Sequence, residues 1–301
     1  MNLYDIIVIG GGPAGLTAAI YAGRANKKTI ILEKGTFGGQ ITSSPKVENI
    51  PGFLSVTGNE FADKLMSQAM ALDAEIECAE VSKIVPGKPH KVVTDEGEFF
   101  AKAIIIATGT KHRLLGLDKE EELIGNGISF CAVCDGAFYE DKTVAVIGGG
   151  NSALQEALLL SQTCKKVYVV QNLDYLTGED KLQKSLKEKS NIEVILGTVV
   201  KKFLGDGELT GIEVSNADKS FEIAVDGLFV AIGLIPQNEA FSEVIKLDDY
   251  GYIDAGEDCL TSVEGIYVAG DCRKKRIRQV ATAASDGAIA ALAACSYIEQ
   301  N

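Results

Sequence analysis

A glycine-rich turn near the amino terminus constrains the fold of this chain more than any other feature. Residues 4–9 are a continuous apolar run, as expected of a strand buried on both faces of a sheet. The turn follows directly and reads Gly10-Gly11-Gly12-Pro13-Ala14-Gly15, which has the GxGxxG spacing. A helix with apolar periodicity and a second strand at residues 29–32 complete a βαβ unit. In such a unit the turn binds the diphosphate of a dinucleotide at the start of the helix.

The individual residues of this unit fit that chemistry. Gly10 permits a tight turn, Gly12 lets the backbone approach a diphosphate, and Gly15 allows the helix to pack closely on the strand. Glu33 ends the second strand, where a carboxylate can bind a ribose hydroxyl. We therefore predict a dinucleotide site here. A glycine turn that only packs a helix on a sheet is the alternative.

A second unit of the same kind occupies the middle of the chain. A strand at residues 143–147 leads into Gly148-Gly149-Gly150, and a helix at 152–162 and a strand at 166–170 follow. Two mononucleotide-type domains explain this repeat better than one.

The end of the chain has no third glycine fingerprint. It contains a strand-like run at residues 265–269, then Gly270-Asp271, then a helical stretch at 279–299, and such a segment is expected to complete an earlier domain. The prediction is an α/β fold with two Rossmann-like three-layer domains, the second inserted in the first. Residues 1–114 and 246–301 form one domain, and residues 115–245 form the other.

A cysteine pair lies just before the second glycine turn. Cys131 and Cys134 are three positions apart, so they can close a disulfide, or one can act as nucleophile and the other as resolving thiol. Asp135 follows directly and can move a proton to or from a thiol, or it can merely cap a helix. Half of a zinc site is disfavoured because the chain has only two histidines and no second CxxC. No metal is predicted.

Charge and cysteine usage limit the partners and the compartment. The formal net charge is −13, which argues against nucleic acid and an anionic membrane surface, and no 18-residue apolar run predicts a membrane span. Seven cysteines are an odd count for a secreted disulfide framework, so we expect a cytoplasmic protein whose other five thiols are packed in the core.

The motifs, in this order and spacing, resemble the low-molecular-weight thioredoxin reductases over nearly the whole chain. The resemblance implies FAD in the domain that is split in sequence, a homodimer, and a rotation between domains that presents the cysteine pair alternately to flavin and to thioredoxin. It implies that Cys134 faces the flavin, Cys131 attacks thioredoxin, and Asp135 is the acid/base. The positions expected to bind FAD are Gly10, Gly12, Pro13, Ala14, Gly15, Glu33, Lys34, Gly39, Gln40, Asn49, Ala107, Thr108, Gly109, Gly270, Asp271, Arg278, Gln279 and Val280.

The match breaks where NADPH-dependent members of that family bind the coenzyme. They carry His-Arg-Arg at the end of the strand after the second glycine turn and another Arg four residues on, where this chain has Gln171, Asn172, Leu173 and Thr177. Charge-assisted hydrogen bonds contribute roughly 1.5–3 kcal/mol each, so their loss predicts poor NADPH use. Lys181 and Lys184 substitute only as point charges, and Gln171 lacks the carboxylate that NADH would favour.

A basic segment suggests another electron donor. Arg273, Lys274, Lys275 and Arg276 stand together in an acidic chain, either as a solvated loop or as a docking surface for an acidic protein. Ferredoxins are small acidic proteins, and plant-type centres lie near −400 mV against about −270 mV for thioredoxin, so transfer is downhill by roughly 6 kcal/mol for two electrons. The chain thus resembles the ferredoxin-dependent flavin thioredoxin reductases.

Three alternatives remain open from the sequence. One is a thioredoxin reductase driven by NAD(P)H through atypical contacts. Another is a nicotinamide–ferredoxin oxidoreductase of the same fold, disfavoured because such relatives lack the cysteine pair. The last is a non-catalytic FAD-binding redox sensor, against which the intact Cys131–Asp135 set stands.

Overall fold

The computed structural model describes residues 3–44 and 46–301, and the chain divides into two compact units. Unit 1 comprises Met1–Lys111 and Ile235–Asn301, and unit 2, His112–Leu234, is inserted between them. The chain passes between the units at β7 (Thr110–His112) and β16 (Leu234–Pro236), which pair with each other. The chain therefore has an α/β fold with two Rossmann-like domains, one inserted in the other.

The second boundary differs from the expected one. The chain re-enters unit 1 at Ile235, whereas the sequence placed this point after residue 245. The reason is packing: Phe241 and Ile245 are 1% and 2% exposed and belong to the same apolar cluster as Ile7 and Ile9 of the first strand. The first boundary falls at Lys111, slightly before the expected residue 114.

Unit 1 is built on a seven-stranded sheet, in the order β3-β2-β1-β6-β5-β4 with β17 also paired to β6. Its strands and helices are β1 (Leu3–Ile9), α1 (Pro13–Arg24), β2 (Thr29–Glu33), η1 (Gly39–Ser43), α2 (Gly58–Met70), β3 (Glu75–Cys78), β4 (Val81–Val85), β5 (His90–Thr94), β6 (Gly97–Ile106), η3 (Glu239–Phe241), β17 (Ile266–Val268), η4 (Gly270–Cys272) and α7 (Val280–Gln300).

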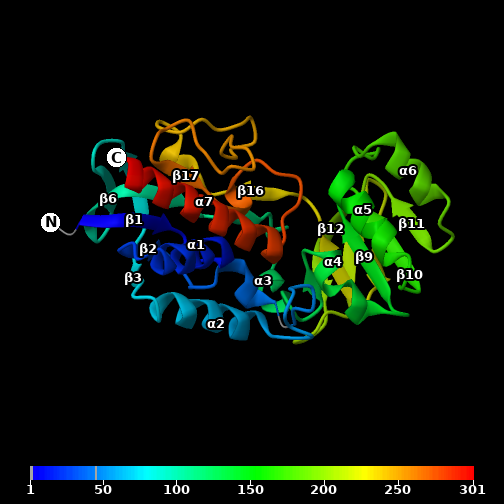
Figure 1. The fold of residues 1–301 in the computed structure, drawn as a ribbon. Coiled ribbons are helices and arrows are strands. Elements are labelled where there is room, and N and C mark those ends of the chain that lie inside the picture. The colour runs from blue at the N-terminus through cyan, green and yellow to red at the C-terminus, as the bar shows by residue number, and fades with distance from the viewer. Residues whose placement is uncertain (1–2, 45) are drawn as a thin grey trace. The chain divides into compact units, whose positions relative to one another are not determined.

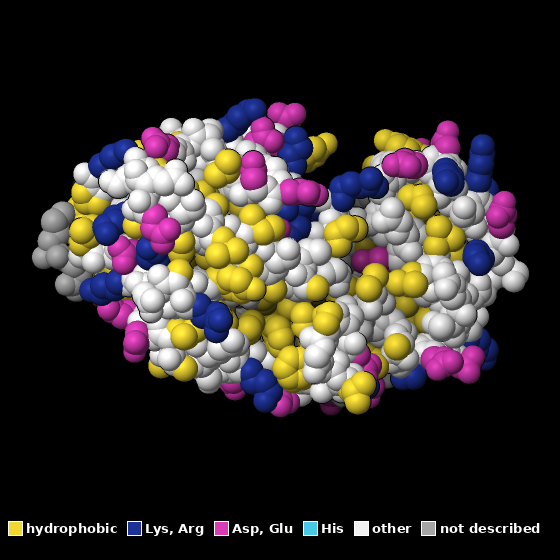
Figure 2. All heavy atoms as spheres, in the orientation of Figure 1, with side chains coloured by type: hydrophobic (Ala, Val, Ile, Leu, Met, Phe, Trp, Pro, Cys, Tyr) yellow, Lys and Arg dark blue, Asp and Glu magenta, His cyan; other side chains and the backbone are white. Residues whose placement is uncertain are grey.

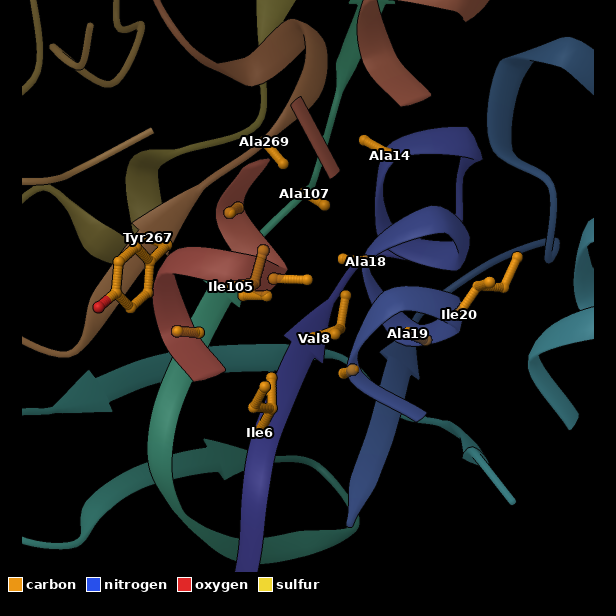
Figure 3. Close-up of a cluster of buried hydrophobic side chains, with 14 of the residues drawn as sticks. Ile6, Val8, Ala14, Ala18, Ala19, Ile20, Ile105, Ala107, Tyr267 and Ala269 are labelled. Carbon is orange, nitrogen blue, oxygen red and sulfur yellow. The ribbon is translucent and has the colours of Figure 1, made fainter. Parts of the chain in front are cut away.

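Alternate residues of β1 supply two separate cores. Ile6 and Val8 face the cluster that α1 and α7 cover, and Figure 3 shows their side chains beside Ala18 and Ile105. Ile7 and Ile9 face the opposite cluster. Because both faces are buried, the strand is apolar from Ile6 to Ile9, which explains the apolar run in the sequence.

Helix α7 covers the same face of the sheet as α1, and the two helices lie side by side (Figure 1). In the described ranges it is the one helix long and apolar enough to cross a membrane by length and composition. Its buried residues, among them Ala290 and Ala294, instead pack in the core that includes α1.

Unit 2 contains a five-stranded parallel sheet in the order β11-β10-β9-β15-β8 and a three-stranded antiparallel sheet, β12-β13-β14. Val144 and Val146 of β9 pack toward α5, whereas Ala145 and Ile147 pack in the cluster shared with the antiparallel sheet. The elements are α3 (Glu120–Leu123), β8 (Ile128–Ser129), α4 (Ala132–Asp135), η2 (Gly136–Tyr139), β9 (Thr143–Ile147), α5 (Asn151–Leu160), β10 (Lys166–Val170), α6 (Asp180–Lys187), β11 (Ile192–Ile195), β12 (Val199–Leu204), β13 (Gly211–Ser215), β14 (Ser220–Ala224) and β15 (Gly227–Val230).

Candidate active site

The turn after β1 depends on close backbone approaches. Gly10 has a φ of +109°, which side chains rarely adopt, and a Cβ there would collide with the carbonyl of Ala107. A Cβ at Gly15 would collide with the carbonyl of Gly10, so glycine lets α1 pack on the turn. The N-cap of α1, Gly12, offers no side-chain cap within the described residues, and Pro13 follows it. The start of α1 therefore suits an anionic ligand.

Glu33 is fixed at the end of β2. Its carboxylate accepts hydrogen bonds from the amides of Gly11 at 2.7 Å and Gly35 at 2.8 Å. It borders a cavity of about 470 Å³ in unit 1, within the size range of small-molecule sites, about 300–1,000 Å³. The cavity is lined by Ile9, Gly10, Leu32, Glu33, Lys34, Ala79, Glu80, Val81, Ser82, Thr94, Asp95, Thr108, Gln237, Glu239, Ala240 and Phe241.

Two further predicted segments border the same turn. The amide of Ala107 donates to Ile9 O at 2.7 Å, which sets residues 107–109 beside Gly10. Thr108 Oγ1 bonds to Asn238 Oδ1 at 3.1 Å, and Gly109 has a φ of +65°. From the other side, a Cβ on Gly270 would stand 2.8 Å from the Cβ of Ala14.

Asp271 is the least satisfied polar group of this region. Its Oδ1 is buried and has no hydrogen-bond partner among residues 3–44 and 46–301. Burial raises the pKa of the carboxyl, although Lys275 and Arg278 act to lower it. An orphaned buried oxygen next to Gly270, which lies close to Ala14 at the start of α1, fits a hydroxyl donor on the linking chain of a flavin dinucleotide.

The remaining predicted contacts lie around Gln279. Its Oε1 accepts a hydrogen bond from Asn49 Nδ2 at 3.1 Å, and it caps α7, whose first residue is Val280. Arg278 Nε donates to the carbonyl of Asp271 at 3.3 Å, and its guanidinium lies 4.3 Å from the ring centre of Tyr252.

Three other predicted positions lie in or near the glycine-rich region. Gly39 is close to Gly12, because a Cβ on it would be 3.2 Å from Gly12 Cα. Gln40 is exposed on η1. Lys34 is also exposed and pairs with Glu80 at 3.1 Å.

The cysteine pair lies in unit 2. Cys131 and Cys134 form a disulfide, with Cα atoms 5.3 Å apart, and Cys131 is the N-cap of α4. The amide of Cys134 donates to Cys131 Sγ at 3.2 Å. Val133, which lies between the two cysteines in the sequence, is exposed. The pair is therefore presented on one short helical turn.

Asp135 occupies the N-cap position of η2, but its side chain does not cap that helix. Its Oδ2 instead accepts a hydrogen bond from Ser129 Oγ at 2.6 Å. Its Oδ1 is buried without a partner in the described part of the chain, and burial raises its pKa. A carboxyl with a raised pKa that directly follows Cys134 in sequence can donate a proton to a thiolate more readily than an ordinary carboxyl. No group of three or more potential metal ligands occurs among the described residues.

The second glycine turn is crowded by two of the residues that replace the expected cations. Gln171 is 6% exposed, and a Cβ on Gly149 would lie 2.6 Å from its side-chain amide. Thr177 Oγ1 would lie 3.7 Å from a Cβ on Gly150. The turn is thus bordered by uncharged side chains.

The basic segment is not a continuous surface, which corrects the docking surface expected from the sequence. Arg273 bonds to both oxygens of Asp286 at 2.9 Å, and Lys275 Nζ lies 2.8 Å from Oδ2 of the same carboxylate. Their side chains are only 10% and 7% exposed. Lys274 and Arg276 are exposed, and we call them the exposed basic pair.

Sequence reasoning missed several residues of these sites. The cavity residues on β4 and β5 are Val81, Ser82 and Thr94, and they belong to no motif, because isolated residues of common types have no recognisable spacing. Ser129 orients Asp135 and also accepts the amide of Cys131 at 3.1 Å. A hydroxyl six residues before a carboxylate has no recognisable spacing.

Residues 4–287 match the family model of pyridine nucleotide-disulphide oxidoreductases, which defines the class of the protein. A thioredoxin reductase of Listeria monocytogenes is 42% identical over 303 residues, covering 99% of this chain and 95% of the relative. A Clostridium pasteurianum relative, described as a 34.2 kDa protein in a rubredoxin operon, is 40% identical over 98% of this chain and 97% of its own length. The solved thioredoxin reductase from Streptococcus pyogenes is 37% identical, with a TM-score of 0.95 over 99% of both chains.

The chain therefore belongs to the low-molecular-weight thioredoxin reductase family. Its cofactor is FAD, as in that family, and its CxxC disulfide is redox-active.

Proposed function

We propose that this protein reduces the disulfide of thioredoxin with electrons from reduced ferredoxin, through FAD and the Cys131–Cys134 disulfide. The observation that carries the choice of donor is the second glycine turn, where neutral Gln171 and Thr177 border the glycines. The segment after β10 also exposes Asp174, Glu179 and Asp180. These carboxylates would repel a 2′-phosphate, and the exposed Lys181 and Lys184 offset only part of their charge.

FAD is proposed to lie along the β1–α1 turn of unit 1. The diphosphate would bind at the start of α1, and the Glu33 carboxylate would accept from a ribose hydroxyl. Asp271 Oδ1, which has no partner among the described residues, would accept from a hydroxyl of the linking chain. When bound, flavin accepts electrons singly and gives them up as a pair, which a one-electron donor requires.

The thiol chemistry is assigned to the residues of α4. In the reduced pair, the Cys131 thiolate attacks one sulfur of the thioredoxin disulfide and the other sulfur leaves as a thiol. Cys134 then attacks the mixed disulfide, which releases the second thioredoxin thiol and restores Cys131–Cys134. Asp135, held by Ser129, supplies or accepts the proton that these exchanges require.

The exposed basic pair is the part of the basic segment that we propose for ferredoxin docking. Lys274 and Arg276 are exposed and are followed by Ile277, which is 62% exposed. Opposite charges at such a contact accelerate association and set orientation, while an apolar neighbour adds contact area. The rubredoxin operon of the clostridial relative links a family member to another one-electron carrier.

We further propose a homodimer that works in the cytoplasm. Apolar side chains gather over the region of α1, α2 and α7 in Figure 2, and Tyr21 and Leu292 on these helices are 39% and 55% exposed. Such patches favour association between proteins. Five unpaired cysteines suit a reducing compartment.

The donor is tested by anaerobic flavin reduction. Oxidised protein is mixed with reduced ferredoxin, NADPH or NADH, and the flavin absorbance near ~450 nm is followed, with dithionite as the control for a competent flavin. We expect rapid bleaching by ferredoxin and dithionite only. Rapid bleaching by either nicotinamide would replace ferredoxin with the NAD(P)H-driven alternative.

A further inference from the structure

Glu156 is a half-buried residue whose carboxyl oxygen Oε2 is buried, and the proposed chemistry does not use it. On α5, Ala153, Glu156, Ala157 and Leu160 follow helical spacing on one face, and the three apolar members are at most 1% exposed. That face packs against α4, because Ala132 belongs to the same cluster and a Cβ on Gly136 would touch Leu160 at 3.2 Å. Glu156 is therefore directed toward the segment that holds the redox-active pair.

The carboxyl of Glu156 has one polar contact with that segment. It accepts a backbone hydrogen bond from Ala132, the first residue of α4, while its Oε2 is buried without a partner among the described residues. Burial raises its pKa to about 8, although the Ala132 amide acts to lower it. Glu156 is thus neutral at pH 7 and loses its proton in the mildly alkaline range.

No charged side chain contributes to this pKa shift. The strands packed against α5 contribute Val144, Val146, Val167 and Val169 to the cluster, all apolar. Helix α6, which also packs on α5, carries the charged residues Asp180, Lys181, Lys184 and Lys187, and all four are exposed. The titratable groups on α4 are Asp135 and, after reduction, the two thiols, and η2 adds Tyr139, whose pKa burial raises to about 12.

We propose that Glu156 is a positioning residue of the redox-active pair, which holds the first turn of α4 through the Ala132 amide and couples its own proton to reduction of the disulfide. This proposal rests on the family chemistry and is independent of the electron donor. Reduction breaks the S–S bond with two electrons, and in Cys-X-X-Cys motifs one of the two thiols formed ionises near neutral pH. A thiolate on α4 disfavours a second negative charge at Glu156.

The coupling between Glu156 and the disulfide determines how many protons the protein takes up when the disulfide is reduced. Below about pH 7.5, Glu156 is protonated in both redox states, and reduction takes up only the proton that forms the thiol. Above pH 8, the oxidised protein has lost the Glu156 proton, and the new thiolate draws it back, so two electrons bring in one additional proton. By linkage, the equilibrium constant for reduction then falls by up to an additional factor of about ten per pH unit.

The test measures this equilibrium constant between pH 7 and pH 9.5 in the full-length, FAD-loaded protein. The wild type, Glu156→Gln and Glu156→Asp are equilibrated with reduced and oxidised dithiothreitol, quenched with an alkylating reagent, and analysed for the peptide that carries Cys131 and Cys134. Gln keeps an acceptor for the Ala132 amide but cannot ionise. Gln155→Glu is the matched control, because residue 155 is exposed on the same helix.

We expect the wild type and Glu156→Gln to agree near pH 7 and to diverge above pH 8, by up to about tenfold at pH 9. The equilibrium constant of Glu156→Asp should also differ from that of Glu156→Gln above pH 8. The profile of Gln155→Glu should follow that of the wild type. Parallel profiles of the wild type and Glu156→Gln up to pH 9.5 would refute the proposal, as would a Gln155→Glu profile that departs equally from the wild type. If Glu156→Gln does not fold, an additional proton in the wild-type and Glu156→Asp profiles above pH 8 supports the coupling, and its absence from both refutes it.

Discussion

Replacing Asp286 with asparagine should destabilise unit 1 strongly, because this carboxylate neutralises two buried cations. Its side chain is 5% exposed, and its oxygens accept two hydrogen bonds from Arg273 at 2.9 Å and one from Lys275 at 2.8 Å. Oδ2 also accepts the amide of Gly270 at 3.0 Å, immediately before Asp271. Asn preserves the shape and part of the hydrogen bonding but removes the charge.

The magnitude follows from the burial of the ion pair. Removing one partner of a buried ion pair costs roughly 3–5 kcal/mol, because the remaining charge stays desolvated. For a domain of this size, about 2–4 °C of melting temperature is lost per kcal/mol, so Asp286→Asn should melt roughly 6–20 °C lower at pH 7. Differential scanning calorimetry measures this, and the bound flavin absorbance reports whether the Gly270 turn still holds FAD.

The pH dependence has a definite sign. Burial acts to raise the Asp286 pKa, but hydrogen bonds from Arg273 and Lys275 outweigh it and lower the pKa. The ion pair therefore stabilises the protein above the usual carboxyl pKa and is lost as pH falls through the lowered value. The deficit should be complete at pH 7 and shrink only in strong acid. Asp254→Asn, which removes a partly exposed acid paired with Lys246, is the control and should not change the melting temperature measurably. Equal melting of Asp286→Asn and the wild type would refute the reasoning.

Three further predictions concern function. Cys134→Ser should accumulate a mixed disulfide between Cys131 and thioredoxin, visible by intact mass, whereas the same adduct with Cys131→Ser would reverse the assigned roles. Charge reversal of Lys274 and Arg276 to glutamate should slow flavin reduction by ferredoxin about tenfold or more at low salt and leave dithionite reduction unchanged; an unchanged ferredoxin rate would exclude this docking surface. Installing His-Arg-Arg at residues 171–173 together with Thr177→Arg should tighten NADP⁺ binding by at least about a hundredfold in calorimetry, and no gain would show that other features bar the coenzyme.

The sequence was most informative at the glycine turn after β1, where the same backbone conformation is needed for packing and for binding. The apolar run of β1 and the glycines at 10, 12 and 15 predict a strand, a turn and a helix, because a side chain at Gly10 or Gly15 would collide with backbone. The disulfide could also be predicted from the sequence, since two cysteines three positions apart share one helical turn.

Ion pairs and packing contacts between residues distant in the sequence could not be predicted from it. From the sequence alone, the basic segment is expected to be a continuous surface. In the structure, Asp286 of α7, ten or more residues away, pairs with Arg273 and Lys275. Likewise, Gln155 and Glu156 are adjacent polar residues in a helix, and nothing local indicates that only Glu156 faces α4. Phe241 and Ile245 are four positions apart, which indicates one apolar face, but local spacing does not show which unit this face packs against.

The most direct test of the central claim counts electrons through complete turnover. Under anaerobic conditions, catalytic amounts of the protein are given oxidised thioredoxin and either reduced ferredoxin or NADPH, while new thioredoxin thiols and oxidised donor are quantified together. We expect two ferredoxins to be oxidised for each thioredoxin disulfide that is reduced, and no thiol formation above background with NADPH. Comparable thiol formation with NADPH, or ferredoxin oxidation that produces no thiols, would contradict it.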